Sequence, residues 1–394
     1  MNNKINKIVA ISIGSFPYGG AVTNRHISYL KGLVEMGVDV HILLLARSVD
    51  HSILSNQSEG EFSGIKFKYG TFDEVKKKLS LNKIMIRIKG LLRIRSYLIN
   101  KFLPDQNTAL LFLVVDPVSL YVFRKLAKKF KMKIFHERME YPFIHRTNTI
   151  KKLWIYFYLY QLKYLNGLYV ISSELAAYYK KYIDIKKIFL LPMTVEPDRF
   201  NIPKTACSYG DYIAYCGTMH SNKDGVPCLI KAFDIFASHY PYVNLVLIGD
   251  NSNRQVIEDV LYTASKANHK NRIYFTGKLE RNEIPNLLVN ARVLALARSA
   301  NKQAKGGFPT KLGEYLATGN PVVVTKVGEI PYYLEHKKSA YLAEPDDPND
   351  FAEKLKEIFN DYAKARKIGL EGKNLAFSVF NYKIQAKRLL EFIN

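Results

Sequence analysis

The sequence predicts an α/β protein built from two doubly wound, Rossmann-like domains. Short β-branched, apolar runs alternate with amphipathic stretches, and this alternation occurs once in each half of the chain. The 394 residues suffice for two or three domains. With 48% apolar and 24% charged residues, the composition is globular and excludes disordered, collagen-like and coiled-coil chains.

The first half opens with the pattern of a buried strand at residues 7–13 (KIVAISI). A loop over 14–20 follows, and residues 23–36 place apolar side chains at helical spacing. Gly37 is expected to end this helix. Further strands are predicted at 40–45, 109–115, 133–135 and 167–171.

The second half repeats this order from Asp211, where DYIAYC forms a strand that ends in a Gly-Thr turn. Helices are predicted at 227–239, 284–290 and 310–318, and strands at 244–248, 272–275, 293–297 and 321–325. These strands lack polar alternation, which is typical of a parallel sheet buried on both faces.

A proline-containing segment at 191–204 separates the halves, and residues 381–392 form a final amphipathic helix. We therefore expect an N-terminal domain at 1–190, a linker at 191–210, a second domain at 211–375 and a C-terminal helical segment at 376–394.

The net charge is +23, which favours anionic partners, and residues 1–200 carry most of the excess, with 32 basic and 15 acidic side chains. The segment from Lys76 to Lys101 has nine basic residues, no acidic ones and interleaved isoleucines and leucines, as in a helix lying on an anionic membrane. A solvated basic helix packed on the sheet is the alternative. A second basic patch at 124–133 supports the membrane reading only if it shares that face.

Other sequence signals concern compartment and targeting. Three cysteines without a Cys-x-x-Cys pair indicate neither a disulfide framework nor a zinc site. The N-terminus lacks a signal-peptide cleavage site, and the longest apolar stretch, 109–123, is broken by Asp116 and Pro117, so no transmembrane helix is expected.

The most informative stretch is 306–324, GGFPTKLGEYLATGNPVVV, in which a glycine-rich loop leads into a helix. Glycines let a phosphate approach the backbone, and the first N–H groups of a helix attract anions. The expected donor-binding residues of this loop are Gly306, Gly307, Phe308, Pro309, Thr310 and Lys311. Glu314, one turn later, could accept hydrogen bonds from the vicinal hydroxyls of a ribose. Alone, such a turn is more often ordinary helix capping.

This stretch resembles the donor-site motif of the family 4 (group 1) glycosyltransferases of GT-B fold, of bacterial surface-polysaccharide type: Glu, seven residues, Glu, then Ala-x-Gly-x-Pro-Val. Glu314, Ala317, Gly319, Pro321 and Val322 match, whereas Gly306 occupies the position of the first Glu. The resemblance implies two Rossmann-like domains facing across a cleft, with a C-terminal helix crossing back to the first domain. It assigns ribose binding to Glu314 and leaves sugar recognition without its usual Glu.

Residues 215–233 (YCGTMHSNKDGVPCLIKAF) resemble the family segment that holds the donor diphosphate. The resemblance places Lys223 on the diphosphate, with Thr218 where the family has Arg; Arg298, Lys302, Lys305 or Lys311 could replace that cation. Without the family, Lys223 would be read as a surface lysine. Gly277, in IYFTG, falls in the family's loop beside the nucleotide base.

In the first domain, SFPYGGA at 15–21 resembles the family's glycine-rich loop, whose amides near Gly19 and Gly20 would face donor phosphates and acceptor. Seen alone, it reads equally as a strand-to-helix turn. FHERMEYP at 135–142 resembles a His-containing segment, which makes His136 the candidate contact of the transferred sugar, oriented by Glu137. A lone His beside a carboxylate is otherwise usually structural.

The resemblance implies a retaining, metal-independent hexosyltransferase without a cofactor, acting from a nucleotide-diphosphate (UDP- or GDP-) sugar on a lipid-linked or growing bacterial surface glycan. Its expected catalytic residues are His136, Lys223 and Glu314. Its expected place is cytoplasmic, peripheral on the inner face of the plasma membrane. A sugar-nucleotide epimerase or a phosphorylase would share the fold. A nucleic-acid binder is disfavoured because no recognised motif with its aromatic platforms is present.

Overall fold

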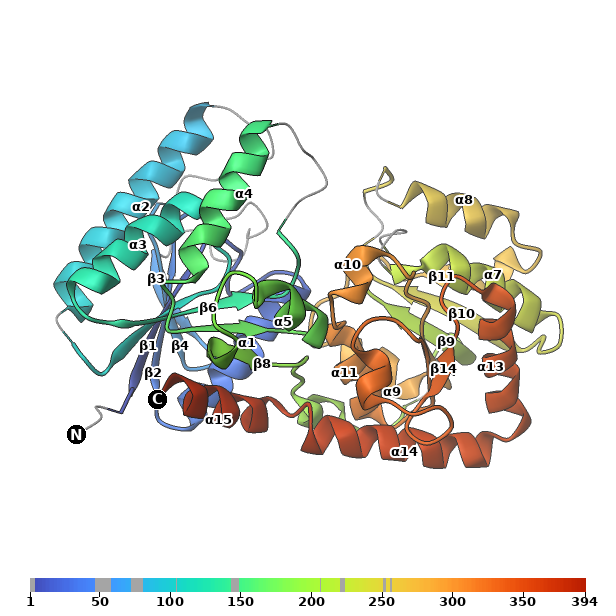
Figure 1. The fold of residues 1–394 in the computed structure, drawn as a ribbon. Coiled ribbons are helices and arrows are strands. Elements are labelled where there is room, and N and C mark those ends of the chain that lie inside the picture. The colour runs from blue at the N-terminus through green and yellow to red at the C-terminus, as the bar shows by residue number, and fades with distance from the viewer. Residues whose placement is uncertain are drawn as a thin grey trace. The chain divides into compact units, whose positions relative to one another are not determined.

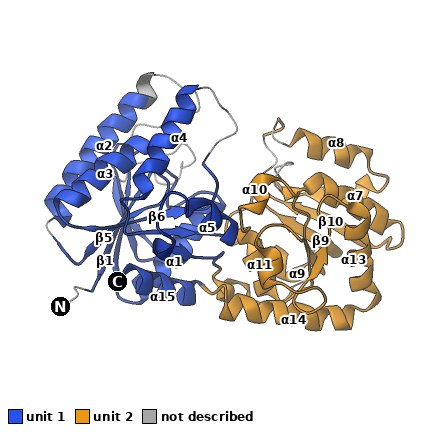
Figure 2. Cartoon of the chain, in the orientation of Figure 1, with its two compact units in different colours: residues 1–194, 382–394 blue, residues 195–381 orange. Residues whose placement is uncertain are grey.

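The computed structural model describes residues 4–46, 58–71, 81–103, 105–142, 149–205, 207–219, 224–250, 253–255 and 257–394. These residues form two compact units, 1–194 with 382–394 (unit 1) and 195–381 (unit 2) (Figure 2). The division falls at 194/195 and 381/382, so most of the expected linker belongs to unit 2.

Unit 1 is a doubly wound α/β unit around an eight-stranded sheet in the order β3-β4-β2-β1-β5-β6-β7-β8 (Figure 1). All neighbours are parallel except the edge pair β3 and β4. Its strands are β1(Lys7–Ser12), β2(Asp39–Leu44), β3(Glu59–Phe62), β4(Ile65–Tyr69), β5(Thr108–Phe112), β6(Lys133–Arg138), β7(Gly167–Val170) and β8(Ile188–Leu190). Its helices are α1(Ala21–Glu35), α2(Leu81–Phe102), α3(Pro117–Lys129), α4(Thr149–Leu162), α5(Ser173–Tyr179), η1(Ile185–Lys187) and α15(Tyr382–Ile393).

The core of unit 1 fills the space between its sheet and helix α1, and α15 completes it. Ala386, Leu389 and Ile393 of α15 join this cluster. A Cβ at Gly32 of α1 would come within 2.6 Å of the Ala386 Cβ, so the glycine permits the close approach of the two helices. The predicted return of the C-terminal helix to the first domain is thus confirmed.

Unit 2 is a second doubly wound unit, around a six-stranded parallel sheet in the order β11-β10-β9-β12-β13-β14. Its strands are β9(Asp211–Cys216), β10(Val243–Ile248), β11(Ile273–Phe275), β12(Val293–Leu296), β13(Val322–Thr325) and β14(Tyr341–Ala343). Its helices are η2(Pro197–Phe200), α7(Val226–Ala237), α8(Glu258–Lys266), η3(Lys270–Arg272), α9(Ile284–Asn290), α10(Lys302–Lys305), α11(Thr310–Thr318), α12(Ile330–Tyr333), α13(Pro348–Asn360) and α14(Tyr362–Ser378). The two predicted Rossmann-like sheets are confirmed.

None of the helices in the described parts of the chain is both long and apolar enough to cross a membrane.

Candidate active site

Three glycines meet where neighbouring strands of unit 2 end. Gly217 follows β9, Gly249 follows β10, and Gly277 follows β11. Gly249 forms an isolated bridge with Gly277, and a Cβ at Gly249 would clash with the carbonyl oxygen of Gly217. In a parallel sheet, this carboxyl edge is where ligands bind. Gly277, predicted to bind the donor, lies at this edge and has a left-handed φ of 75° that favours glycine.

Lys311, in the first turn of α11, is held by two acceptors beside this edge. Its Nζ donates to the Tyr215 hydroxyl at 2.9 Å and to Asp224 Oδ2 at 3.0 Å. Asp224 also accepts a hydrogen bond from Tyr215 at 2.8 Å. Burial alone would raise the pKa of the Asp224 carboxyl, but the nearby Lys311 ammonium lowers this pKa below its ordinary value. A lysine ammonium has three donors, so this arrangement leaves one for an anion.

The loop before α11 supplies backbone rather than side chains. Gly306 ends α10, and the Arg298 guanidinium lies 3.4 Å from the position of a Cβ at Gly307. The Phe308 side chain is buried, and its ring stacks on Tyr333 with the ring centres 5.3 Å apart. Only the backbone of Phe308 can therefore contact a nucleotide-sugar donor. Pro309 precedes α11 without a side-chain cap, and the first turn, with Thr310, begins there. Such an end favours an anion.

Glu314 lies one turn further along α11, and its carboxylate faces an arginine that the motif did not indicate. Arg199 Nη1 lies 3.5 Å from Glu314 Oε1. The other terminal nitrogen of Arg199, Nη2, donates to the carbonyl oxygen of Arg281 at 2.9 Å. Burial raises the pKa of Glu314 above its ordinary value, against the opposing effect of Arg199. The carboxyl remains one-quarter exposed, which suits an acceptor for ligand hydroxyls.

Two other predicted residues precede α7. Thr218 is exposed just after β9. Lys223, the predicted diphosphate ligand, lies outside the described residues. Of the cations considered in place of the family's arginine, Lys302 and Lys305 are exposed on α10, whereas Arg298 is only 2% exposed.

In unit 1, the glycine-rich loop leads from β1 into α1. Gly19 and Gly20 are exposed, and Gly20 precedes α1 without a side-chain cap. A Cβ at Gly20 would meet nothing within 4 Å, whereas one at Gly19 would clash with Thr23. Space beside the backbone is therefore free at Gly20, whereas at Gly19 it is filled by Thr23, which donates a hydrogen bond to the Ser15 carbonyl oxygen.

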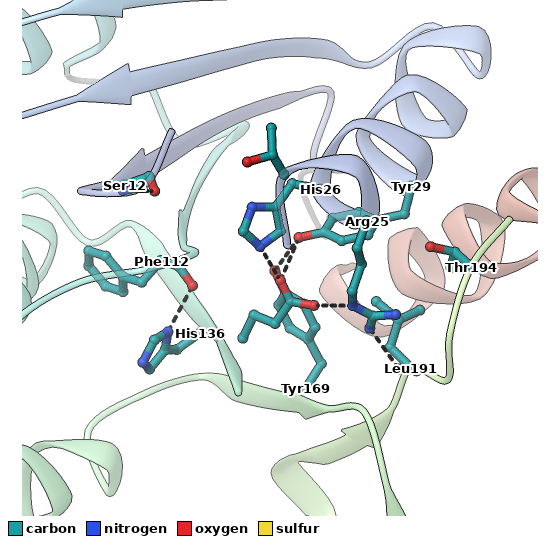
Figure 3. Close-up of polar contacts among 12 residues, drawn as sticks. Ser12, Arg25, His26, Tyr29, Phe112, His136, Tyr169, Leu191 and Thr194 are labelled. Atoms are coloured by element: carbon teal, nitrogen blue, oxygen red, sulfur yellow. Dashed lines mark hydrogen bonds and ion pairs between the residues drawn. The ribbon is translucent and has the colours of Figure 1, made fainter. Parts of the chain in front are cut away.

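His136 lies inside strand β6 and has no exposed surface. Its Nδ1 lies 2.8 Å from the Phe112 carbonyl oxygen (Figure 3). Its Nε2 lies 2.6 Å from the Tyr158 hydroxyl. Burial, with Arg138 nearby, lowers the pKa of His136 to about 3. Both ring nitrogens of a neutral imidazole are thus occupied, and the geometry gives His136 no atom for a sugar.

Glu137 does not orient His136, which corrects the expectation for this pair. Arg25 Nε donates to Glu137 Oε1 at 2.8 Å, and His26 Nε2 and the Tyr29 hydroxyl lie 2.8 and 3.0 Å from Oε2. Burial alone would raise the pKa of Glu137, but Arg25 and His26 lower this pKa to about 2. Figure 3 shows Arg25 reaching from α1 to Leu191, with which it forms a 2.7 Å hydrogen bond.

The sequence reading missed Asp224, Tyr215 and Arg199, which hold the two predicted residues of α11. Arg199 belongs to the proline-containing segment at 191–204, and Asp224 follows Lys223 directly. The one sequence signal for Asp224 is its position next to Lys223, and for Arg199 its position in the segment between the two halves. The described residues contain no group of three or more His, Cys, Asp or Glu side chains placed to hold a metal ion.

Comparison with known proteins gives a family match in unit 2. Residues 210–361 match the family model described as glycosyl transferases group 1. Trehalose phosphorylase from Pleurotus pulmonarius is 35% identical over 81 residues, 21% of this chain and 11% of that protein. The uncharacterized glycosyltransferase YqgM of Bacillus subtilis (strain 168) is 25% identical over 206 residues, 50% of this chain and 53% of that protein.

Among solved structures, Anabaena Alr3699/HepE in complex with UDP-glucose has a TM-score of 0.72 at 13% identity, covering 98% of both chains. The chain spans about half the length of the Bacillus relative and about a tenth of the phosphorylase. The likeness to HepE concerns the fold of the whole chain, and the family match concerns unit 2. The chain therefore has the GT-B fold, and its residues 210–361 are similar to the group 1 glycosyl transferases.

Proposed function

We propose that this protein is a retaining, metal-independent glycosyltransferase that transfers a hexose from a UDP-sugar. The observation that carries the proposal is the Lys311 ammonium, held by Asp224 and Tyr215 at the uncapped start of α11, one turn before Glu314. A cation beside a helix N-terminus fits a diphosphate, and a carboxylate fits ribose hydroxyls. The likeness to a protein solved with UDP-glucose favours uridine as the base.

The chemistry follows from where charge develops. As the glycosidic bond breaks, negative charge grows on the leaving UDP, and Lys311 with the first N–H groups of α11 would stabilise it. The acceptor hydroxyl attacks from the same face of the sugar, and the departing phosphate takes its proton. No protein nucleophile is needed. Lys223, one residue before Asp224, would add a second cation to the diphosphate.

The remaining predicted residues enter with narrower roles. Glu314 would accept from the ribose, Gly277 would border the base, and the amides of Gly19 and Gly20 would face donor phosphates and acceptor. His136 enters as a positioning residue because its bonds to Phe112 and Tyr158 fix the carboxyl half of β6.

The proposed acceptor is a lipid-linked or growing surface glycan, reached from the cytoplasmic face of the membrane. Two features support it: the excess of basic side chains in residues 1–200 and the exposed apolar residues of unit 1. The proposal that the acceptor is a glycan comes from the resemblance of residues 306–324 to the family motif.

A phosphorylase is the second candidate because of the 35% identity to trehalose phosphorylase over 81 residues. A phosphorylase would use inorganic phosphate in place of the nucleotide as the leaving or attacking group. Release of glucose 1-phosphate from a disaccharide, dependent on phosphate and independent of UDP, would establish this activity.

The deciding experiment is a thermal-shift titration with UDP, GDP, ADP, UDP-glucose and inorganic phosphate, with and without EDTA. A ligand at about 100 times its Kd stabilises the folded state by about 2.7 kcal/mol. We expect a selective shift with UDP and UDP-glucose that EDTA does not change. A shift with phosphate alone would favour the phosphorylase, and no shift with any nucleotide would refute the transferase.

A further inference from the structure

Helix α4 of unit 1 carries much of its apolar surface toward solvent. Tyr158, Leu159 and Leu162 are buried, as expected for a helix packed on a core. Other apolar side chains of the helix are exposed. These residues, with their exposed fractions, are Ile150 (65%), Leu153 (63%), Trp154 (46%), Tyr156 (65%), Phe157 (36%) and Tyr160 (56%). Burying them requires a partner outside the unit.

Helix α3 continues this surface. The Tyr121 and Phe157 rings lie 5.8 Å apart, which joins the two helices through their exposed sides. Val118 and Tyr121 of α3 are 44% and 39% exposed. We call Val118, Tyr121, Ile150, Leu153, Trp154, Tyr156, Phe157 and Tyr160 the α3–α4 surface.

Positive charge borders this surface, and negative charge does not enter its helices. Lys163 Nζ lies 3.9 Å from the Tyr160 ring centre, and Lys125 Nζ lies 5.6 Å from that of Tyr121. The sequences of α3 and α4 contain no Asp or Glu; Asp116 caps α3 from outside. Tyrosine and tryptophan with flanking lysines are typical of a membrane–water interface, where rings enter the acyl boundary and ammonium groups stay at the headgroups.

We propose that the α3–α4 surface docks unit 1 on an anionic membrane, with Leu153, Trp154 and Tyr156 entering the lipid interface. Protein interfaces are depleted in lysine, and here lysines line the border, so lipid headgroups fit better than a protein partner. This deepens the membrane part of the proposed function by assigning a surface. The proposal also places the membrane contact on the α3–α4 surface, whereas the sequence predicts it at the segment from Lys76 to Lys101.

Helix α2 is consistent with the same orientation. Right-handed connections between parallel strands place α2, α3 and α4 on one side of the sheet, opposite α1, and Figure 1 shows these three helices together. Ile84, Met85, Ile88 and Leu92 of α2 are exposed, and its sequence contains no Asp or Glu. The described part of the predicted basic segment thus shares the side on which the α3–α4 surface lies.

Trp154 makes the test specific because it is the single tryptophan of the chain. Its fluorescence is recorded while the protein is titrated with phosphatidylcholine vesicles or with vesicles that also contain phosphatidylglycerol. We expect a blue shift only with the anionic vesicles, quenching by brominated lipid, and loss of binding at high salt. No blue shift and no flotation with anionic vesicles would overturn the proposal.

The matched variants place aspartates on this surface or far from it. Leu153→Asp/Tyr156→Asp should lower the vesicle partition coefficient by about tenfold or more, since it removes apolar burial and adds repulsion. Tyr262→Asp/Tyr332→Asp, at positions 64% and 76% exposed in unit 2, should bind vesicles like the wild type. Equal loss in both pairs would refute the assignment.

Two readouts separate the other outcomes. A blue shift that grows with protein concentration without lipid, together with a dimer mass, would make the surface a protein interface and overturn the proposal. Thermal shift by UDP is measured on the same variants without vesicles. If Leu153→Asp/Tyr156→Asp keeps this shift, UDP binding does not depend on the α3–α4 surface, so the nucleotide site and the membrane surface can be refuted independently of each other.

Discussion

The pair formed by Lys311 and Asp224 offers a direct test of the candidate active site. Their side chains are 15% and 6% exposed, and Lys311 Nζ lies 3.0 Å from Asp224 Oδ2. Lys311→Met leaves the Asp224 carboxylate in that environment with the hydrogen bond from Tyr215. Removing one member of a buried ion pair costs about 3–5 kcal/mol. For a unit of this size, the melting temperature falls by about 2–4 °C per kcal/mol, so we expect a loss of about 6–20 °C.

The same change should weaken UDP binding because a charge-assisted hydrogen bond to the diphosphate is lost. A bond of about 1.5–3 kcal/mol corresponds to a loss of about 10- to 150-fold in affinity. The double variant Lys311→Met/Asp224→Asn separates the two effects. Without the unpaired carboxylate it should recover most of the stability, and UDP affinity should stay low. Asp224→Asn alone should bind UDP at least as tightly as the wild type, because nothing then offsets the Lys311 charge.

Calorimetry measures both quantities, melting by differential scanning and the UDP dissociation constant by isothermal titration. Wild-type melting of Lys311→Met would refute the buried pair. Wild-type UDP affinity in the double variant would remove Lys311 from the diphosphate site, whatever its part in stability.

Three further predictions concern single side chains. Glu314→Gln should weaken UDP binding by about tenfold and abolish discrimination against 2′-deoxy-UDP, and a variant that still discriminates would remove the ribose role. The pKa of His136 is about 3 in the folded state against a reference of 6.5. The unfolded state therefore binds the extra proton between these pH values, and stability falls as pH falls, by up to about 1.4 kcal/mol per unit. Denaturant unfolding of His136→Gln should show a shallower slope in this range, and an equal slope would contradict the assignment. Arg25→Met should cost unit 1 about 3–5 kcal/mol by leaving the buried Glu137 carboxylate without its arginine partner, with Arg25→Met/Glu137→Gln as the control that recovers part of it.

The parallel strands could be predicted because a strand buried on both faces is a continuous apolar run. Residues 7–13 and 244–248 were predicted as strands and correspond to β1 and β10. Strand β6 shows the limit of this signal. The apolar run ends at Phe135, so the strand was predicted to end there, but β6 continues to Arg138. Tertiary hydrogen bonds make His136 and Glu137 acceptable inside the sheet, and one sequence does not reveal those partners.

The candidate active site divides in the same way. Lys311 and Glu314 follow from a local motif, because three residues on a helix place both on neighbouring turns. Asp224 and Arg199 reach them from 87 and 115 residues away, so only the fold identifies them. The sequence does not predict that α4 exposes apolar side chains. Periodicity shows that a helix has an apolar side, but it does not show which side packs on the sheet.

Helix α15 has a consequence for biogenesis. Residues 382–394 complete the core of unit 1, yet the ribosome makes them after all of unit 2. During synthesis, the N-terminal unit lacks the side chains that α15 adds to its core until the whole chain has been made. Unit 2 is contiguous and can fold as it emerges. The order of maturation thus runs against the order of translation, and a stop codon before residue 382 would damage the N-terminal unit.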